Sequence, residues 1–291
     1  MNALSETKFI MKKYNITANK NYGQNFLIDD DIIEGIVENA DINSNDLIIE
    51  IGPGLGTLTA ELLKKAGKVI SIELDPKMIN ILNDRFSLYE NFELINQDVL
   101  KVDLNTLINS NLENSNLNNA KVVANLPYYI TTPIIMKLLE EKLNLKSITV
   151  MVQKEVALRL AAKPGEKDTG AITYSINYYT EPKIVLDVPN HSFIPAPEVN
   201  SAVIKLNILE SPRVKLNNEK LFFDIIKAAF LQKRKTLVNA LNNSKLFDNK
   251  NEILEMLDNL NIDKNIRGEK LSIEQYAQIT DYIQSKGKYN G

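Results

Sequence analysis

The sequence predicts an α/β protein in two parts: a helix-covered parallel sheet over residues 1–210 and a small all-helical domain over residues 211–291. Two observations lead to this prediction. Short apolar runs alternate with segments of helical periodicity as far as residue 208, and strands that alternate with helices favour a parallel sheet. Beyond Ser211-Pro212 no strand pattern remains, and apolar residues recur only at helical spacing.

The expected strands are short apolar runs bounded by residues that favour turns. They lie at residues 46–51, 69–73, 92–96, 121–124, 148–152, 183–188 and 202–208. The expected helices carry apolar residues three and four apart, and they lie at 32–37, 58–66, 76–86, 132–139, 155–162, 221–231, 236–241, 253–260 and 273–283. Residues 105–119 indicate a weak helix followed by a loop. Residues 171–179 fit either a helix or a strand.

A glycine-rich loop follows the first strand, in the stretch Glu50-Ile-Gly-Pro-Gly-Leu-Gly-Thr57. Gly52 and Gly54 allow a sharp turn and a close approach of a ligand, which is typical of the first βα turn of a Rossmann-like sheet. A dinucleotide fingerprint requires a third glycine where Thr57 stands. The preceding Glu50 would repel a pyrophosphate but suits the sulfonium and ammonium of S-adenosylmethionine. The loop alone leaves that cofactor and other nucleotides open.

Two further acids end predicted strands on the side where nucleotides bind. Glu73 lies about 20 residues beyond the glycine loop, where a carboxylate accepts hydrogen bonds from ribose hydroxyls. Capping of the following helix is the alternative role, and Asp75 could perform that instead. Asp98 could accept from an adenine amino group, or it could be an ordinary turn aspartate.

The stretch Asn125-Leu126-Pro127-Tyr128 ends the fourth predicted strand. Proline lacks an N–H, so the chain must leave the sheet and expose backbone there. An asparagine oxygen and a free carbonyl could accept both hydrogens of an exocyclic amine, and the Tyr128 ring could stack on the base. Such a turn is typical of enzymes that methylate amino nitrogens of bases; an ordinary proline turn is the alternative. Phe193, held between prolines, could supply a second aromatic face for an extruded base, or it could simply pack in the core.

Composition excludes several kinds of site. The chain has no cysteine and a single histidine, His191, which excludes disulfides, thiolate metal sites, a Cys nucleophile and a His-rich metal site. We therefore expect no metal. No secretory or transmembrane stretch is found, so we expect a soluble, cytoplasmic protein that binds no membrane.

Charge is distributed unevenly along the chain. Residues 211–291 carry 14 Lys and Arg against 10 Asp and Glu, whereas residues 1–210 carry 20 against 27. A basic tail on an acidic body fits partial contact with a polyanion, although uneven surface charge explains the count nearly as well. Lys233, Arg234 and Lys235 follow one another on an expected helix, where they could bind phosphates or simply be solvated.

Taken in order, these motifs resemble the ribosomal RNA adenine N6-dimethyltransferase family over nearly the whole chain. The matching stretches are 24–27, 50–54, 73–75, 97–98, 125–128, 153–156, 193–199, 233–235 and 271–275. The resemblance implies a class I S-adenosylmethionine-dependent methyltransferase fold. It also implies methylation of two adjacent adenosines in the 3′-terminal hairpin of 16S rRNA, within the small ribosomal subunit or its precursor. Tyr129 and Asn200 depart modestly from the family pattern.

The resemblance also assigns roles to residues. It implies that Asn25 and Leu27 hold the methionine end of the cofactor, with Gly52 lining the loop. Glu73 would take the ribose and Asp98 the adenine. Asn125 would lie where the cofactor and the target amine meet.

Three alternatives remain open on the sequence. The nearest is the sister enzyme that dimethylates 23S rRNA and confers macrolide resistance, because it shares the same cofactor and Asn-x-Pro-Tyr motifs. A non-catalytic RNA-binding assembly factor would keep the fold, although the intact acids and Asn125 speak against it. An NAD-dependent dehydrogenase fits Glu73 but fails at Thr57.

Overall fold

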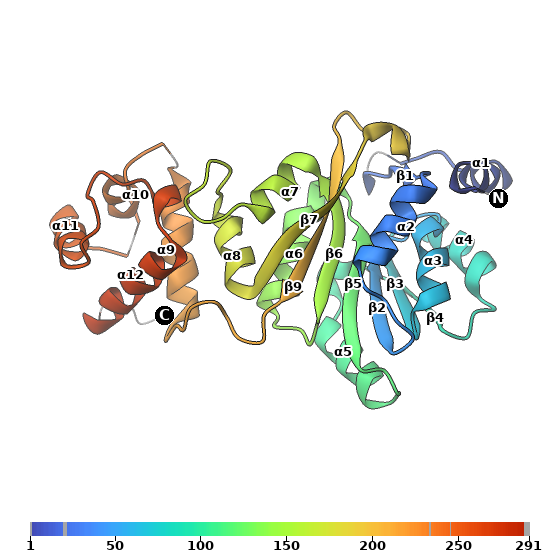
Figure 1. The fold of residues 1–291 in the computed structure, drawn as a ribbon, viewed down its shortest axis with the longest axis horizontal. Helices are drawn as coiled ribbons and strands as arrows, with labels where there is room; N and C mark the ends of the chain where they lie inside the picture. The colour runs from blue at the N-terminus through green and yellow to red at the C-terminus, as the bar shows by residue number, and fades with distance from the viewer. Residues whose placement is uncertain (1, 20–21, 233, 245, 288–291) are drawn as a thin grey trace. The chain divides into compact units, whose positions relative to one another are not determined.

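The computed structural model describes residues 2–19, 22–232, 234–244 and 246–287, and it forms two compact units (Figure 1). The first unit comprises Met1–Ala157 with Pro182–Ile208, and the second comprises Leu158–Glu181 with Leu209–Gly291. Residues 158–181 were predicted to belong with the sheet, but they cluster with the tail helices in the second unit. No helix in the described ranges is both long and apolar enough to cross a membrane.

The first unit is built on a seven-stranded sheet of order β4-β3-β2-β5-β6-β9-β7. Its strands are β2 (Asp46–Ile51), β3 (Lys68–Glu73), β4 (Phe92–Asn96), β5 (Asn119–Asn125), β6 (Ser147–Gln153), β7 (Thr180–Val188) and β9 (Ser201–Ile208). All seven predicted strands are present. The sheet is parallel from β4 to β6, as predicted, and β9 runs antiparallel to β6, which was not predicted. A parallel connection between neighbouring strands requires a crossover, usually an α-helix. The described residues between β7 and β9 contain no α-helix.

The strand order creates a switch point between β2 and β5. From β2 the chain steps outward to β3 and β4, and it then returns to place β5 and β6 on the other side. In open α/β sheets, ligands bind where the carboxyl ends of strands diverge at such a point. The ends of β2 and β5 carry the glycine loop and Asn125, so the topology brings these two motifs together.

Helices pack around the sheet and make up most of the second unit (Figure 1). The helices are α1 (Ala3–Lys13), α2 (Asp30–Asn39), α3 (Thr57–Lys65), α4 (Pro76–Phe86), α5 (Leu104–Glu113), α6 (Thr131–Glu140), α7 (Lys154–Ala161), α8 (Ala171–Tyr179), α9 (Glu219–Leu231), α10 (Leu237–Asn242), α11 (Lys250–Asn259) and α12 (Ile273–Ser285). A two-stranded ribbon pairs β1 (Phe26–Leu27) with β8 (Phe193–Ile194). Helix α1 was not predicted, and the ambiguous stretch 171–179 is helical.

Aromatic side chains fill the core of the second unit. Tyr174 of α8 and Tyr276 of α12 are fully buried, with ring centroids 4.9 Å apart in an edge-to-face arrangement. The Tyr174 hydroxyl donates to the Leu271 carbonyl at 2.7 Å, so its polar end is satisfied inside the core. Tyr178 of α8 packs against Phe222 of α9. Helix α8 is therefore an integral part of this unit.

A buried ion pair joins the amino-terminal halves of β2 and β5. Lys121 Nζ lies 2.8 Å from Asp46 Oδ2, and the two side chains are 6% and 0% exposed. Asp46 also accepts hydrogen bonds from Asn43 and Asn119. Burial raises the pKa of Asp46, but the hydrogen bonds from Lys121, Asn43 and Asn119 outweigh it and leave this pKa below its ordinary value. The pair therefore keeps both charges satisfied at a dry position.

Gly56, at the start of α3, offers a sharp test of the glycine loop. Its φ is +82°, and a Cβ there would overlap the Phe86 ring and lie 2.9 Å from Leu82 Cδ2. We expect Gly56→Ala to lower the free energy of unfolding by about 1–2 kcal/mol for the left-handed backbone and about 1–3 kcal/mol more for the overlap. Urea unfolding measures the change. Gly52→Ala is the control, because Gly52 has a similar φ of +67° but its nearest neighbour lies 3.8 Å away. Equal losses in both variants would contradict the overlap.

Candidate active site

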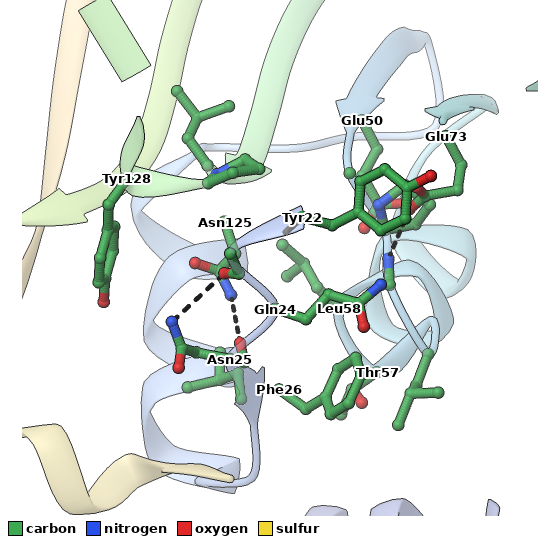
Figure 2. A pocket seen from close by; sticks show the side chains of 18 residues that line it. Tyr22, Gln24, Asn25, Phe26, Glu50, Thr57, Leu58, Glu73, Asn125 and Tyr128 are labelled. Carbon is green, nitrogen blue, oxygen red and sulfur yellow. Dashed lines mark hydrogen bonds between the residues drawn. The ribbon is translucent and has the colours of Figure 1, made fainter. Parts of the chain in front are cut away.

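A pocket of about 750 Å³, open to solvent, lies at the carboxyl ends of β2 and β5 (Figure 2). Its walls come from three stretches far apart in the sequence: residues 22–27, the glycine loop within 50–58, and residues 125–128. Glu73, at the end of β3, completes it. In Figure 2, Asn125 and Asn25 lie on one side and Glu73 on the other, with Tyr22 between them. The predicted candidates in these stretches thus converge on one cavity, whereas Asp98 and Phe193 are not among the residues that line it.

The carboxylate of Glu73 is anchored by backbone donors. Oε1 accepts from the N–H groups of Leu74 and Asp75, at 2.8 Å each, and Oε2 accepts from the Gly54 N–H at 3.3 Å. Burial raises the pKa of Glu73 despite these hydrogen bonds. Asp75, not Glu73, caps α4 by accepting from the Lys77 N–H. Glu73 is therefore a fixed acceptor at the pocket wall, and the capping alternative belongs to Asp75.

Glu50 carries a buried oxygen without a hydrogen-bond partner among the described residues. The side chain is 1% exposed; Oε2 accepts from Thr59 Oγ1 and Ser71 Oγ, at 2.7 Å each, while Oε1 is unpaired. Burial raises the pKa of Glu50 to about 7, against the hydrogen bonds that lower it, and the nearby charge of Glu73 raises it further. Because Glu50 lines the pocket, a cationic ligand would compensate this carboxylate.

The raised pKa of Glu50 predicts a pH-dependent penalty in the ligand-free protein. In the unfolded chain this carboxyl ionises near its ordinary pKa, so between that value and about 7 the folded state holds the extra proton and stability falls as pH rises. We compare the free energy of unfolding of Glu50→Gln with that of the unsubstituted protein at pH 5 and at pH 8. The difference should shift in favour of the variant by on the order of 3 kcal/mol from the lower to the higher pH. Urea unfolding at both pH values measures it. A difference that stays constant with pH would contradict the prediction.

The turn after β5 is held from both sides. The Leu126 N–H donates to the Met151 carbonyl at 3.2 Å, which keeps the turn against β6, and the Pro127 carbonyl accepts from Thr131 Oγ1 at 3.1 Å. Asn125 Nδ2 donates to the Asn25 carbonyl at 3.3 Å. The amide of Asn125 is thus oriented by its nitrogen, and Asn125 and Tyr128 both line the pocket.

The β1–β8 ribbon changes the interpretation of Phe193. Leu27 and Phe193 pair directly, and their side chains are 4% and 2% exposed. Leu27 lines the pocket as expected, but Phe193 lies in the hydrophobic core behind the ribbon. Phe193 is therefore not one of the residues that line the pocket, and a stacking role for its ring stays a prediction. The alternative, a packing residue that supports Leu27, is what the structure shows.

Asp98 lies beside the main pocket, not in it. It lines an adjoining pocket of about 430 Å³ together with Leu74 and Tyr129, and this pocket shares Glu73 and Tyr22 with the larger one. Asp98 Oδ1 accepts from the Leu100 N–H at 3.0 Å, which is the turn role weighed as the alternative. Tyr22 lines both pockets and was not predicted as a site residue, because no motif marks it.

Arg234 and Lys235 of the basic stretch lie in a turn and not on a helix. Helix α9 ends at Leu231, and Thr236 begins α10 by accepting from the Asn239 N–H. Arg234 and Lys235 lie between them and are exposed, whereas Lys233 lies outside the described residues.

The comparison with known families gives one match that covers almost the whole chain. A family model described as ribosomal RNA adenine dimethylase matches residues 15–285. The chain belongs to the ribosomal RNA adenine dimethylase family. The resemblance inferred from the motifs is therefore confirmed.

Relatives and solved structures agree with membership of the dimethylase family. The "Ribosomal RNA small subunit methyltransferase A" of Alkaliphilus metalliredigens is 49% identical to the chain, over 97% of this chain and 97% of its own length. The protein of the same name from Bacillus pumilus is also 49% identical, over 96% of this chain and 95% of its own length. A dimethyladenosine transferase from Plasmodium falciparum superposes with a TM-score of 0.75 at 28% identity, over 90% of this chain and 98% of its own. The 23S rRNA methyltransferase ErmE shares the fold, with a TM-score of 0.66 at 23% identity over 89% of this chain and 100% of its own.

Proposed function

We propose that the chain transfers methyl groups from S-adenosylmethionine to N6 of two adjacent adenosines in the 3′-terminal hairpin of 16S rRNA. The product is N6,N6-dimethyladenosine at each position. The observation that carries this proposal is the position of the Asn125–Tyr128 turn beside Glu73, at one pocket over the switch point of the sheet. The names of the relatives support the small subunit as the target. A substrate of this kind would make the protein cytoplasmic.

The pocket residues suit S-adenosylmethionine. Glu73 would accept from the ribose hydroxyls and Asp98 from the adenine amino group, while Asn25, Leu27, Gly52 and Gly54 would surround the methionine end. The unpaired Oε1 of Glu50 supports a cationic ligand and not a pyrophosphate, because a second negative group there would oppose a buried carboxylate. When bound, the cofactor supplies an activated methyl group.

The turn residues would act on the adenine amine. Its lone pair is delocalised into the ring, so the amine is a poor nucleophile. The Asn125 side-chain oxygen and the Leu126 carbonyl would each accept one N6 hydrogen, and would thereby draw the nitrogen toward tetrahedral geometry. Tyr128 would stack on the extruded base. Positioning would supply most of the rate enhancement, and the methylated amine can lose its proton to water without a general base.

The second unit supplies the surface for RNA in this proposal. We assign residues 211–291 to binding of rRNA, with Arg234 and Lys235 on phosphates because both are exposed in the turn between α9 and α10. We propose the same role for Lys233, which lies outside the described residues. The excess of positive charge in this part of the chain supports the assignment.

Transfer of tritium from labelled S-adenosylmethionine tests the proposal. Small ribosomal subunits from cells that lack the two dimethyladenosines should gain up to four methyl groups each, and large subunits none. Mass spectrometry of the 3′-terminal fragment locates the label. Labelling of large subunits would favour the 23S rRNA enzyme, and binding to small subunits without transfer would favour a non-catalytic assembly factor.

A further inference from the structure

Tyr128 is anchored by a serine that does not belong to the pocket. The Tyr128 hydroxyl and Ser201 Oγ lie 2.6 Å apart, although the two residues are 73 positions apart in the sequence. Tyr128 is half-buried and lines the pocket, whereas Ser201 is fully buried and is not one of the described residues that line it. Ser201 can therefore affect a ligand in this pocket only indirectly, and its side chain is bonded to a residue that does line the pocket, Tyr128.

The serine is itself fixed by the sheet. Ser201 opens β9 and pairs with Gln153 at the end of β6, the strand that lies between β9 and β5. The backbone of Tyr128 follows β5, and its hydroxyl reaches past β6 to β9. The ring is thus held at both ends, by the turn after Pro127 and by the bond to Ser201. Rotation about the Cα–Cβ bond of Tyr128 would swing the hydroxyl away and break the bond to Ser201, so this bond holds the direction of the long axis of the ring.

An oriented ring matters for recognition of a flat base. A free side chain would lose rotational freedom when a base stacks on it, and that entropy loss would weaken binding. A ring that is already oriented avoids this loss. Burial of the Ser201 hydroxyl strengthens the argument, because a hydroxyl without access to water needs its partner and holds it in place.

We propose that Ser201 is a positioning residue that fixes the long axis of the Tyr128 ring at the pocket wall, so that a swung-out adenine meets a ring already in place. This inference rests on the proposed function of the pocket. The proposed function and the role of Ser201 can fail separately. Methyl transfer by the unsubstituted protein tests the function, and the ratios of kcat/KM among the variants test the role of Ser201.

Four variants test the inference: Ser201→Ala, Tyr128→Phe, the double variant and Ser201→Thr. Because Ser201→Ala and Tyr128→Phe remove the same bond, each should lower kcat/KM for small subunits about tenfold, chiefly through KM. The double variant should lose no more than either single variant. Ser201→Thr keeps a hydroxyl at the same place and should restore most of the activity. Affinity for S-adenosylmethionine, measured by calorimetry, should stay within about twofold, since the bond lies away from Glu73.

The matched control is Ser192→Ala. Ser192 is also a buried serine of the first unit, and its Oγ donates to Asp29 Oδ2 at 2.7 Å, but it does not line the pocket. Loss of the Ser192 hydroxyl should lower the stability of the protein without changing KM for small subunits. If kcat/KM of the double variant fell by the product of the two single-variant factors, the inference would be overturned. An effect of Ser201→Ala confined to stability or to cofactor affinity would overturn it too. Should Ser201→Ala fold too poorly to assay, the inference falls if Tyr128→Phe keeps full activity.

Discussion

Replacement of Asn125 by alanine is expected to lower the rate of methyl transfer at least about a thousandfold, while S-adenosylmethionine still binds. The amide oxygen is one of two acceptors proposed for the target amine, and the nitrogen orients it through the Asn25 carbonyl. Alanine removes both functions, while Glu73 and the glycine loop stay in place. Single-turnover transfer to small subunits measures the rate, and calorimetry measures cofactor binding.

Asn119 provides a matched control on the same strand. It begins β5 as Asn125 ends it, and its Nδ2 donates to Asp46 Oδ1 at 3.1 Å, away from the pocket. Asn119→Ala should lower stability somewhat and leave the single-turnover rate unchanged. Near-normal transfer by Asn125→Ala would show that the catalytic role assigned to this residue is wrong.

Substitution of Lys121 by methionine is expected to lower the free energy of unfolding by about 3–5 kcal/mol, because it leaves the Asp46 carboxylate buried without its cation. Since the pKa of Asp46 lies below its ordinary value, the contribution of the pair is present above the pKa of the unfolded carboxyl. It is lost as pH falls through the pKa of the folded one. Urea unfolding at neutral and acid pH measures both effects.

The same substitution at Lys13 is the control for this pair. Lys13 Nζ lies 2.8 Å from Asp84, the same distance as in the buried pair, but both side chains are about half exposed. Lys13→Met should therefore change stability little, since water solvates Asp84 when the lysine is absent. A loss at Lys121 no larger than that at Lys13 would contradict the assigned role of burial.

The strands could be predicted because a sheet covered on both faces requires continuous apolar runs, as in the fully buried β2. Features that depend on distant contacts could not. Helix α1 forms where Asn2 caps it and where the Ala3 N–H donates to Asp30 Oδ1 of α2. The antiparallel direction of β9 is a property of pairing and leaves no trace in its own residues.

The site divides in the same way. The glycine loop and the Asn125–Tyr128 turn are local motifs whose chemistry is visible in the sequence, and both line the pocket. The burial of Phe193 could not be seen, because it depends on pairing with Leu27. The bond from Tyr128 to Ser201 could not be predicted either, since nothing in either segment signals the other.

Helix α8 limits how this protein can be divided. Its residues precede β7 and β9 in the chain, yet Tyr174 and Tyr178 are buried among the tail helices. A truncated protein that ended at residue 210 would keep α8 and lose the partners of both tyrosines, and would thereby bring a large aromatic surface into water. Deletion of the tail therefore does not yield an isolated catalytic half. To obtain the first unit as a separate folded protein, residues 158–181 must also be replaced by a short linker.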